Sequence, residues 1–266
     1  MKWLRMLGYY GYSLFEMLLY FKNWPKMVPL FLHTSSSQTR VLKLRRPPLR
    51  IIVRSGMDVW SVKETFLDQF YTRYGVPVQA GWTVVDIGAG IGDFCLYATY
   101  GIPDVVLYAF EPYPNSCELL KRNLALNGVD NVYVNQKAIW STSGDLHLNL
   151  ETGEPLQFTS QEKSAEAMGA NRVVVEALSL ADMFRDETLK KIHLMKMDCE
   201  GAEYEILLNT PPMILERIER IIMEVHDINP VRTRTELIGF LETQRYRVSH
   251  YPNKVHENLG YLFATR

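Results

Sequence analysis

The sequence predicts an α/β fold with a doubly wound, mainly parallel sheet, helices on both faces and a helical and hairpin extension at the N-terminus. Three observations predict it. Short apolar runs alternate with helical patterns along most of the chain, one run leads directly into closely spaced glycines, and several runs end in acidic residues. With 266 residues, 47% of them hydrophobic, the chain can bury a full core.

The N-terminus is predicted to form an apolar helix over residues 3–21. Its polar residues fall on one narrow face at helical spacing: Lys2, Arg5, Ser13 and Glu16. The segment is too short and too interrupted for a transmembrane helix. We expect residues 1–30 to pack on the domain or on a second subunit, as in a homo-oligomer, or to make peripheral contact with a membrane.

Charge and cysteine content restrict the class of protein. The net charge of −1 gives no reason to expect a nucleic-acid partner. The charge is uneven, however, because the first 54 residues hold ten Lys and Arg residues and one acid, Glu16. Three cysteines without CxxC spacing indicate reduced thiols in a cytoplasmic protein.

Residues 41–75 are expected to lead into the core. Two strand-like runs, 41–44 and 49–53, are separated by a Pro-Pro break. Their basic residues suit either a solvated hairpin face or a phosphate-facing patch. A turn at 55–58 and a helix over 61–74 follow. We therefore divide the chain into an extension (1–40), a strand pair and helix (41–75) and a main domain (76–266).

The main domain opens with a strand, a glycine turn and a helix. Residues 84–87 read as a buried strand, Gly88, Gly90 and Gly92 as the turn, and residues 94–98 as the start of a helix. Glycines let backbone N–H groups approach a ligand closely, and Asp86 sits at the strand's carboxyl end, where such sheets bind ligands. The GxGxG spacing does not match the dinucleotide pattern GxGxxG.

A second strand, residues 105–110, ends in Glu111 and Pro112. An acid at this point, about 20 residues past the glycines, is placed to hold two ribose hydroxyls and would repel a 2′-phosphate. The two motifs together predict a site for a nucleoside-containing cofactor.

The rest of the domain continues the alternation of strands and helices. Helices are predicted over 114–126, 178–184 and 232–244. Strands are predicted at 131–135, 146–148, 173–175, 192–197 and 220–223, with a closing antiparallel pair at 246–248 and 259–263. Residues 151–171 are expected to form an exposed excursion.

Polar side chains gather where the predicted strands end: Asp86, Glu111, Asp198 with Glu200 and Glu203, and Glu224 with His226. Because the carboxyl ends of parallel strands share one edge of a sheet, we expect these groups to meet in one crevice. Glu203 could instead compensate a helix dipole, and His226 could be a buried structural histidine.

Several segments together resemble the FkbM-type S-adenosylmethionine-dependent methyltransferases. The resemblance runs from about Arg50 to the C-terminus, and the first forty residues lie outside it. The segments that carry it are Asp86–Gly92, Phe110–Pro112, Lys196–Glu203 and Met223–His226. The Asp-x-Glu-Gly-Ala-Glu run after the lysine-bearing strand is the more specific part, since the glycine turn is shared widely.

This resemblance implies a seven-strand Rossmann-like sheet with its last strand inserted antiparallel, and S-adenosylmethionine as the cofactor of the main domain. It also implies O-methylation of a hydroxyl on a sugar, lipid-linked or natural-product acceptor. In that case Asp198 would face the reacting methyl group. The other implied cofactor-binding residues are Asp86, Gly88, Ala89, Gly90 and Gly92 for the methionine and ribose, Glu111 with Pro112 for the ribose hydroxyls, and Lys137 with Ala138 near the adenine.

Two mechanisms would activate the acceptor hydroxyl. In the first, which we favour, Asp198 or His226 accepts the proton, while Glu200 and Lys196 position the acceptor. In the second, a divalent cation, Mg²⁺ or Mn²⁺, lowers the pKa of the alcohol. The candidate ligands for that cation are Asp198, Glu200, Glu224 and His226.

Two other functions share part of this pattern. An NAD-dependent dehydrogenase would have the glycine turn and Glu111, and the sequence holds one Tyr-x-x-x-Lys match, Tyr133 to Lys137, which begins in the strand predicted at 131–135. A non-catalytic cofactor-binding or scaffolding protein would use the apolar N-terminus to engage a partner. The acceptor, a small molecule or a glycan, is expected to be selected by residues 151–171 and the N-terminal segment.

Overall fold

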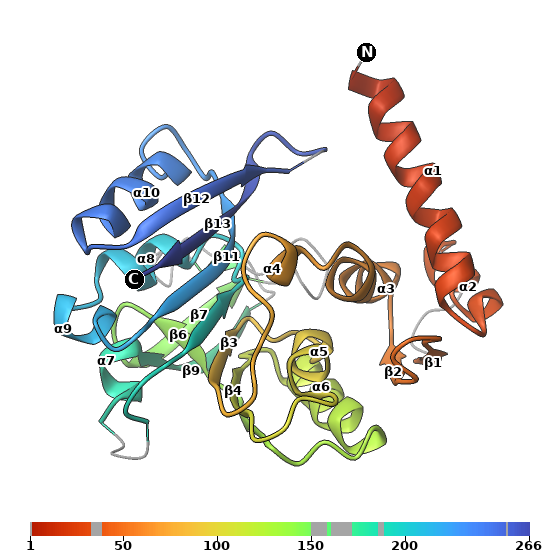
Figure 1. Ribbon diagram of the computed structural model, residues 1–266, viewed down its shortest axis with the longest axis horizontal. Coiled ribbons are helices and arrows are strands. Elements are labelled where there is room, and N and C mark those ends of the chain that lie inside the picture. Colours follow the sequence, from red (N-terminus) through yellow and green to blue (C-terminus); the bar gives the residue numbers. More distant parts are fainter. Residues whose placement is uncertain (1, 33–38, 150–158, 161–171, 186–188, 254) are drawn as a thin grey trace.

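The computed structural model describes residues 2–32, 39–149, 159–160, 172–185, 189–253 and 255–266. A seven-stranded sheet with the strand order β12-β13-β11-β10-β3-β4-β5 forms its centre (Figure 1). Only β13 runs antiparallel to its neighbours, which confirms the predicted sheet with its inserted last strand. The strands are β3 (Thr83–Ile87), β4 (Val106–Phe110), β5 (Val132–Asn135), β10 (Leu194–Met197), β11 (Arg220–His226), β12 (Arg247–Pro252) and β13 (Leu259–Thr265).

Helices cover both faces of this sheet, as predicted. Neighbouring residues of β3 point to opposite sides, so Val84 packs in one apolar cluster with Leu96 and Leu120, and Val85 packs in a second one with Leu237. The first cluster is covered by α5 (Asp93–Thr99) and α6 (Pro114–Leu126), and the second by α8 (Glu203–Leu208) and α10 (Arg234–Thr243). A short helix, α9 (Pro212–Leu215), leads into β11.

The predicted end of β11 at Met223 is wrong. The strand continues to His226, because β13 pairs with it along its whole length, from Arg220 opposite Thr265 to His226 opposite Leu259. Since side chains alternate along a strand, Glu224 and His226 project from the same face of the sheet.

A second, four-stranded sheet lies beside the first, where the sequence predicted only loose strand-like pieces. It has the order β6-β9-β7-β8 and consists of β6 (Ala138–Trp140), β7 (Gly144–Asn149), β8 (Thr159–Ser160) and β9 (Arg172–Ser179). The predicted helix over 178–184 begins later, as α7 (Leu180–Met183), because Ser179 caps it by accepting a hydrogen bond from Asp182 N at 3.0 Å. Apart from β8, the predicted excursion over 151–171 lies outside the described residues.

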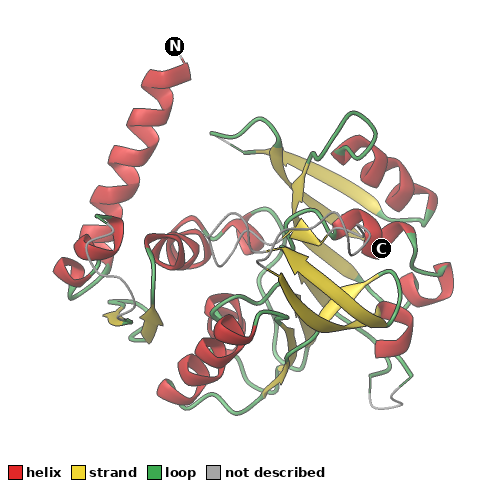
Figure 2. Cartoon of the chain, turned by 180° about the vertical axis from the view of Figure 1, so that it is seen from behind, coloured by secondary structure: helices red, strands yellow, loops and turns green. Residues whose placement is uncertain are grey.

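The N-terminal extension stands at one end of the molecule. Helix α1 (Lys2–Tyr20) is set apart from the large sheet by α3 (Figures 1 and 2). It is followed by η1 (Trp24–Lys26), α2 (Val28–Phe31) and the antiparallel pair β1 (Arg40–Lys43) and β2 (Arg50–Val53). Among the described helices, none is long and apolar enough to cross a bilayer.

The segment between the hairpin and the sheet differs from its prediction. The turn expected at 55–58 is instead the first turn of α3 (Gly56–Lys63), capped by Ser55, whose Oγ accepts a hydrogen bond from Asp58 N at 3.2 Å. The single helix expected over 61–74 is interrupted by a π-helical turn, η2 (Glu64–Asp68), and by Gln69 in the left-handed region at φ 54°, before α4 (Phe70–Arg73). This break turns α4 toward the strand ends.

Candidate active site

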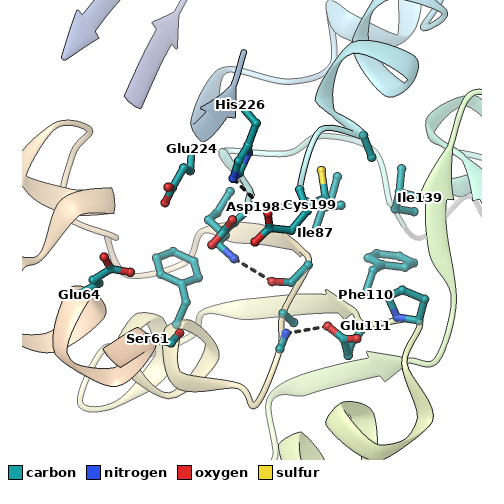
Figure 3. A pocket seen from close by; sticks show the side chains of 18 of the residues that line it. Ser61, Glu64, Ile87, Phe110, Glu111, Ile139, Asp198, Cys199, Glu224 and His226 are labelled. Atoms are coloured by element: carbon teal, nitrogen blue, oxygen red, sulfur yellow. Dashed lines mark hydrogen bonds and ion pairs between the residues drawn. The ribbon is translucent and has the colours of Figure 1, made fainter. Parts of the chain in front are cut away.

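A cavity of about 450 Å³ lies at the carboxyl ends of β3, β4, β10 and β11 (Figure 3). This position and size are usual for a ligand site in an open α/β sheet. Most of the predicted site residues line it: Gly88, Ala89, Gly90, Glu111, Pro112, Ala138, Lys196, Asp198, Glu200, Glu224 and His226.

The glycine turn forms one wall of the cavity and contacts the backbone at the ends of β4 and β10. The backbone N–H groups of Gly88 and Ala89 both donate to Phe110 O, at 3.0 and 3.1 Å. Gly88 has φ +73°, and a Cβ there would lie 1.9 Å from Asp198 O. Only glycine fits this position, because any side chain would collide with the backbone that follows β10.

Glu111 faces the cavity beside this turn. Its Oε2 accepts a hydrogen bond from Gly90 N at 2.8 Å (Figure 3). Its Oε1 accepts one from Tyr113 N at 2.9 Å. Burial raises the pKa of Glu111 to about 7, although both backbone bonds favour the ionised form. The carboxylate is thus held in one orientation with its remaining lone pairs available to a ligand.

A buried ion pair, between Asp86 and Lys196, lies next to the glycine turn. Asp86 Oδ1 lies 3.0 Å from Lys196 Nζ, which also donates to Gly88 O at 2.9 Å. Burial lowers the pKa of Lys196, but the carboxylates of Asp86, Asp198 and Asp93 outweigh burial and raise it. Asp86 is fully buried and is not among the residues that line the cavity, and its carboxylate pairs with Lys196, which in turn contacts the turn.

Two more predicted cofactor residues lie away from the cavity lining. Gly92 ends the turn at φ +83°, where a Cβ would lie 2.9 Å from Leu120 Cγ, so this glycine permits close packing of α5 against α6. Lys137 is half-exposed and forms an ion pair with Glu176 at 2.5 Å in the second sheet. Its neighbour Ala138 does line the cavity.

Asp198 lies at the centre of the opposite wall. Tyr71 of α4 donates a hydrogen bond from its hydroxyl to Asp198 Oδ2 at 2.7 Å. His226 lies with Nε2 3.2 Å from Glu200 Oε2 and Nδ1 3.6 Å from Glu203 Oε1, so the imidazole stands between two carboxylates. The expected convergence of Asp198, Glu200, Glu224 and His226 therefore occurs (Figure 3).

The charges in this cluster set the protonation state of His226. Burial disfavours the imidazolium, but the nearby Glu203, Glu200 and Glu224 outweigh burial and raise the pKa of His226 to about 10. Burial also raises the pKa of Glu200 to about 7 and that of Glu224 well above its usual range. Because His226 carries its proton at neutral pH, Asp198 is better placed than His226 to accept one.

Sequence reasoning missed the contribution of α3, η2 and α4. Trp60, Ser61, Glu64 and Tyr71 line the cavity, although they carry no motif and are distant from the strand ends in sequence. Trp60 Nε1 donates to Glu64 Oε1 at 2.9 Å, while burial and the charge of Asp198 raise the pKa of Glu64 to about 8. The other missed lining residues are Met57, Thr65, Asp93, Phe94, Ile139, Trp140, Leu146, Leu148, Ala202, Asn253, His256, Asn258 and Leu259.

Comparison with known proteins identifies the family. A solved structure described as a putative rRNA-methylase from Clostridium thermocellum superposes with a TM-score of 0.48 at 11% identity, covering 75% of this chain and 96% of that chain. Methyltransferase sdnD of Sordaria araneosa is 32% identical over 203 residues, which cover 66% of this chain and 78% of that protein. The 31-O-demethyl-FK506 methyltransferase FkbM of Streptomyces tacrolimicus is 26% identical over 203 residues, which cover 66% of this chain and 78% of that protein. Residues 86–248 match the model of the methyltransferase FkbM domain, so the chain belongs to the FkbM methyltransferase family.

Proposed function

We propose that this methyltransferase uses S-adenosylmethionine to methylate a hydroxyl group of a small-molecule or glycan acceptor. The observation that carries the proposal is that one cavity joins the glycine turn and Glu111 to Asp198 and the carboxylates around it. The first part suits a nucleoside, and the second suits the removal of a proton from an alcohol. The relatives' names support methyl transfer as the chemistry.

The residues on the Glu111 side fit this cofactor. Glu111 presents an oriented carboxylate to ribose hydroxyls, and the nearby wall formed by Phe110 and Ile139 is apolar, as an adenine ring requires. Gly88 and Gly90 leave their backbone free of side chains at the cavity surface. When bound, S-adenosylmethionine supplies a methyl group already activated by its sulfonium.

On the opposite side, Asp198 accepts the proton of the acceptor hydroxyl. The hydrogen bond from Tyr71 fixes the orientation of one carboxylate oxygen and leaves the other available to the acceptor. Glu64 is mostly protonated at pH 7, so its carboxyl group can donate a hydrogen bond to a second oxygen of the molecule that is methylated. The protonated His226 offsets the negative charge that surrounds the reaction centre.

Asp198, Glu200 and His226 are also candidate metal ligands. One ligand atom each from Asp198, Glu200 and His226 lie within 4.8 Å of one another, which a divalent cation could span. Both nitrogens of His226, however, face carboxylates at 3.2 and 3.6 Å, the arrangement of an imidazolium that itself acts as the cation. We therefore propose the mechanism without a metal.

Removal of divalent cations is expected to leave kcat unchanged, because the imidazolium of His226 already supplies positive charge at the cluster. The measurement is methyl transfer by the EDTA-treated and dialysed enzyme, with and without added Mg²⁺ or Mn²⁺. Loss of turnover that either ion restores would assign Asp198, Glu200 and His226 to a metal site instead.

Calorimetric titration with S-adenosylmethionine and, separately, with NAD tests the cofactor. We expect selective binding of S-adenosylmethionine, weakened about 10- to 100-fold in Glu111→Gln, because the substitution removes charge-assisted hydrogen bonds to the ribose. The exposed Glu118→Gln on α6 is the matched control and should bind normally. Tight NAD binding would overturn the proposal in favour of a dehydrogenase, and cofactor binding without turnover on any hydroxylated acceptor would favour a scaffolding role.

The affinity for the cofactor is also expected to fall as the pH is lowered from 8 to 6. The pKa of Glu111 is about 7 in the free protein, and the ribose hydroxyls need an ionised acceptor, so protonation below pH 7 competes with binding. The loss should be about tenfold across this interval. Titrations at several pH values check it, and the profile of Glu111→Gln should be flat.

A further inference from the structure

Helix α1 presents an apolar face to solvent. The exposed residues from Gly8 to Leu19 are all uncharged, and large side chains dominate them, with Tyr12 62%, Phe15 56% and Leu19 59% exposed. Exposed apolar side chains of η1 and α2 follow in sequence. The outer face is defined by Tyr12, Leu14, Phe15, Leu18, Leu19, Trp24, Val28 and Leu32. Apolar surface of this extent usually marks a contact with a partner or a membrane.

The opposite side of α1 is packed against the rest of the protein, so the helix is firmly attached although its outer face is exposed. Ser13, Met17 and Phe21 are fully buried. Tyr9 accepts a hydrogen bond from the buried Lys63 Nζ at 3.2 Å. Both views show α1 at one end of the molecule, with the described parts of the chain on its inner side (Figures 1 and 2).

Within α1 one half-buried acid, Glu16, lies beside Tyr12, but the charged residues that follow the helix in sequence are basic. Residues 17–57 contain eight Lys and Arg residues and no Asp or Glu. Exposed basic residues adjoin the end of α1, where Lys22 N donates to Lys43 O at 2.8 Å and Arg45 Nε donates to Leu19 O at 2.7 Å. An exposed apolar helix face with aromatic residues, bordered by positive charge, is typical of helices that lie in the interface of an anionic bilayer.

We propose that the outer face and the adjoining basic residues Lys22, Lys26, Lys43, Arg45 and Arg46 dock on an anionic lipid surface. A second copy of the chain is a poorer occupant, because a twofold contact through this face would bring two basic clusters together. The helix lies along the surface and does not cross it, in agreement with its short apolar length. This inference is independent of the proposed reaction.

The test is co-flotation of the full-length protein with vesicles of phosphatidylcholine, with and without phosphatidylglycerol. We expect binding only to the anionic vesicles, reduced by high salt because the basic residues are exposed. Phe15→Glu with Leu19→Glu should lower the partition coefficient more than tenfold, since two charges would enter the apolar layer. Met213→Glu with Val231→Glu, also highly exposed but in the sheet domain, should bind as well as the wild type.

Three results would overturn the proposal. The first is equal binding by the Phe15→Glu, Leu19→Glu variant and the wild type. The second is no vesicle binding by a wild-type protein whose light scattering shows a dimer that the same variant dissociates, which would assign the face to a second copy. The third is equal binding to neutral and anionic vesicles. Unchanged unfolding midpoints in both double variants confirm that the substitutions affect the surface alone, because all four side chains are exposed.

Discussion

Asp198→Asn is expected to lower kcat by about 10²- to 10⁴-fold, the usual contribution of a positioned general base. The amide keeps the shape of the side chain and can still accept the hydrogen bond from Tyr71, but it cannot take the proton of the acceptor. The affinity for S-adenosylmethionine should stay within a few-fold of the wild type. Transfer of a labelled methyl group to an acceptor found by screening with the wild type measures the effect.

Tyr71→Phe distinguishes the role of the Asp198 carboxylate from that of the hydrogen bond that orients it. This variant removes the 2.7 Å hydrogen bond to Asp198 but leaves the carboxylate, so we expect a smaller loss, about tenfold, with a shifted pH profile of kcat. Near-normal turnover in Asp198→Asn would remove Asp198 from the chemistry. An equally large loss in Tyr71→Phe would show that orientation of the carboxylate, and not its basicity, limits the reaction.

Gly88→Ala is expected to abolish cofactor binding and to lower the free energy of unfolding by more than about 2 kcal/mol. The new Cβ would lie 1.9 Å from Asp198 O, so the end of β3 or of β10 must move, and both form walls of the cavity. Chemical denaturation measures the stability, and calorimetric titration of the folded variant measures the binding.

Gly101→Ala is the matched control for this substitution. Gly101 has φ +72°, almost the value of Gly88, but outside Gly101 and its two chain neighbours no atom lies within 4 Å of an added Cβ. It should therefore show only the cost of a left-handed alanine, about 1 kcal/mol, and bind cofactor normally. Equal destabilisation in both variants would mean that the close contact between Gly88 and Asp198 contributes nothing.

The parts of the fold that follow from local signals were predictable. Helix α6 begins at Pro114 and ends before Asn127 and Gly128, as expected, because these residues favour a helix start and a helix end through their own backbone preferences. The grouping of Glu111 and Asp198 at one cavity was predictable too, since it needs only the rule that parallel strands end at one edge.

The features that the sequence did not reveal depend on distant contacts. Tyr71 reaches Asp198 across 127 positions of the chain, and only the π-helical turn before α4 brings it there. The end of β11 at His226 depends on pairing with Leu259 of β13. Which side of α1 faces outward was not predictable, because the apolar pattern does not indicate which side of a largely apolar helix is buried: the polar Ser13 faces inward.

Helix α3 makes a shortened form of this protein an unsuitable substitute for the full chain. Trp60 of α3 lines the cavity. Its ring also contacts Tyr9 and Tyr10 of α1, with ring centroids 6.1 and 5.5 Å from that of Trp60. Lys63, one turn further along, is buried between Tyr9 and Asp68. Removal of the residues before 41 would expose the ammonium group of Lys63 and remove the aromatic contacts that hold the indole ring of Trp60. Acceptor screens on the shortened enzyme would therefore test a cavity with an altered wall.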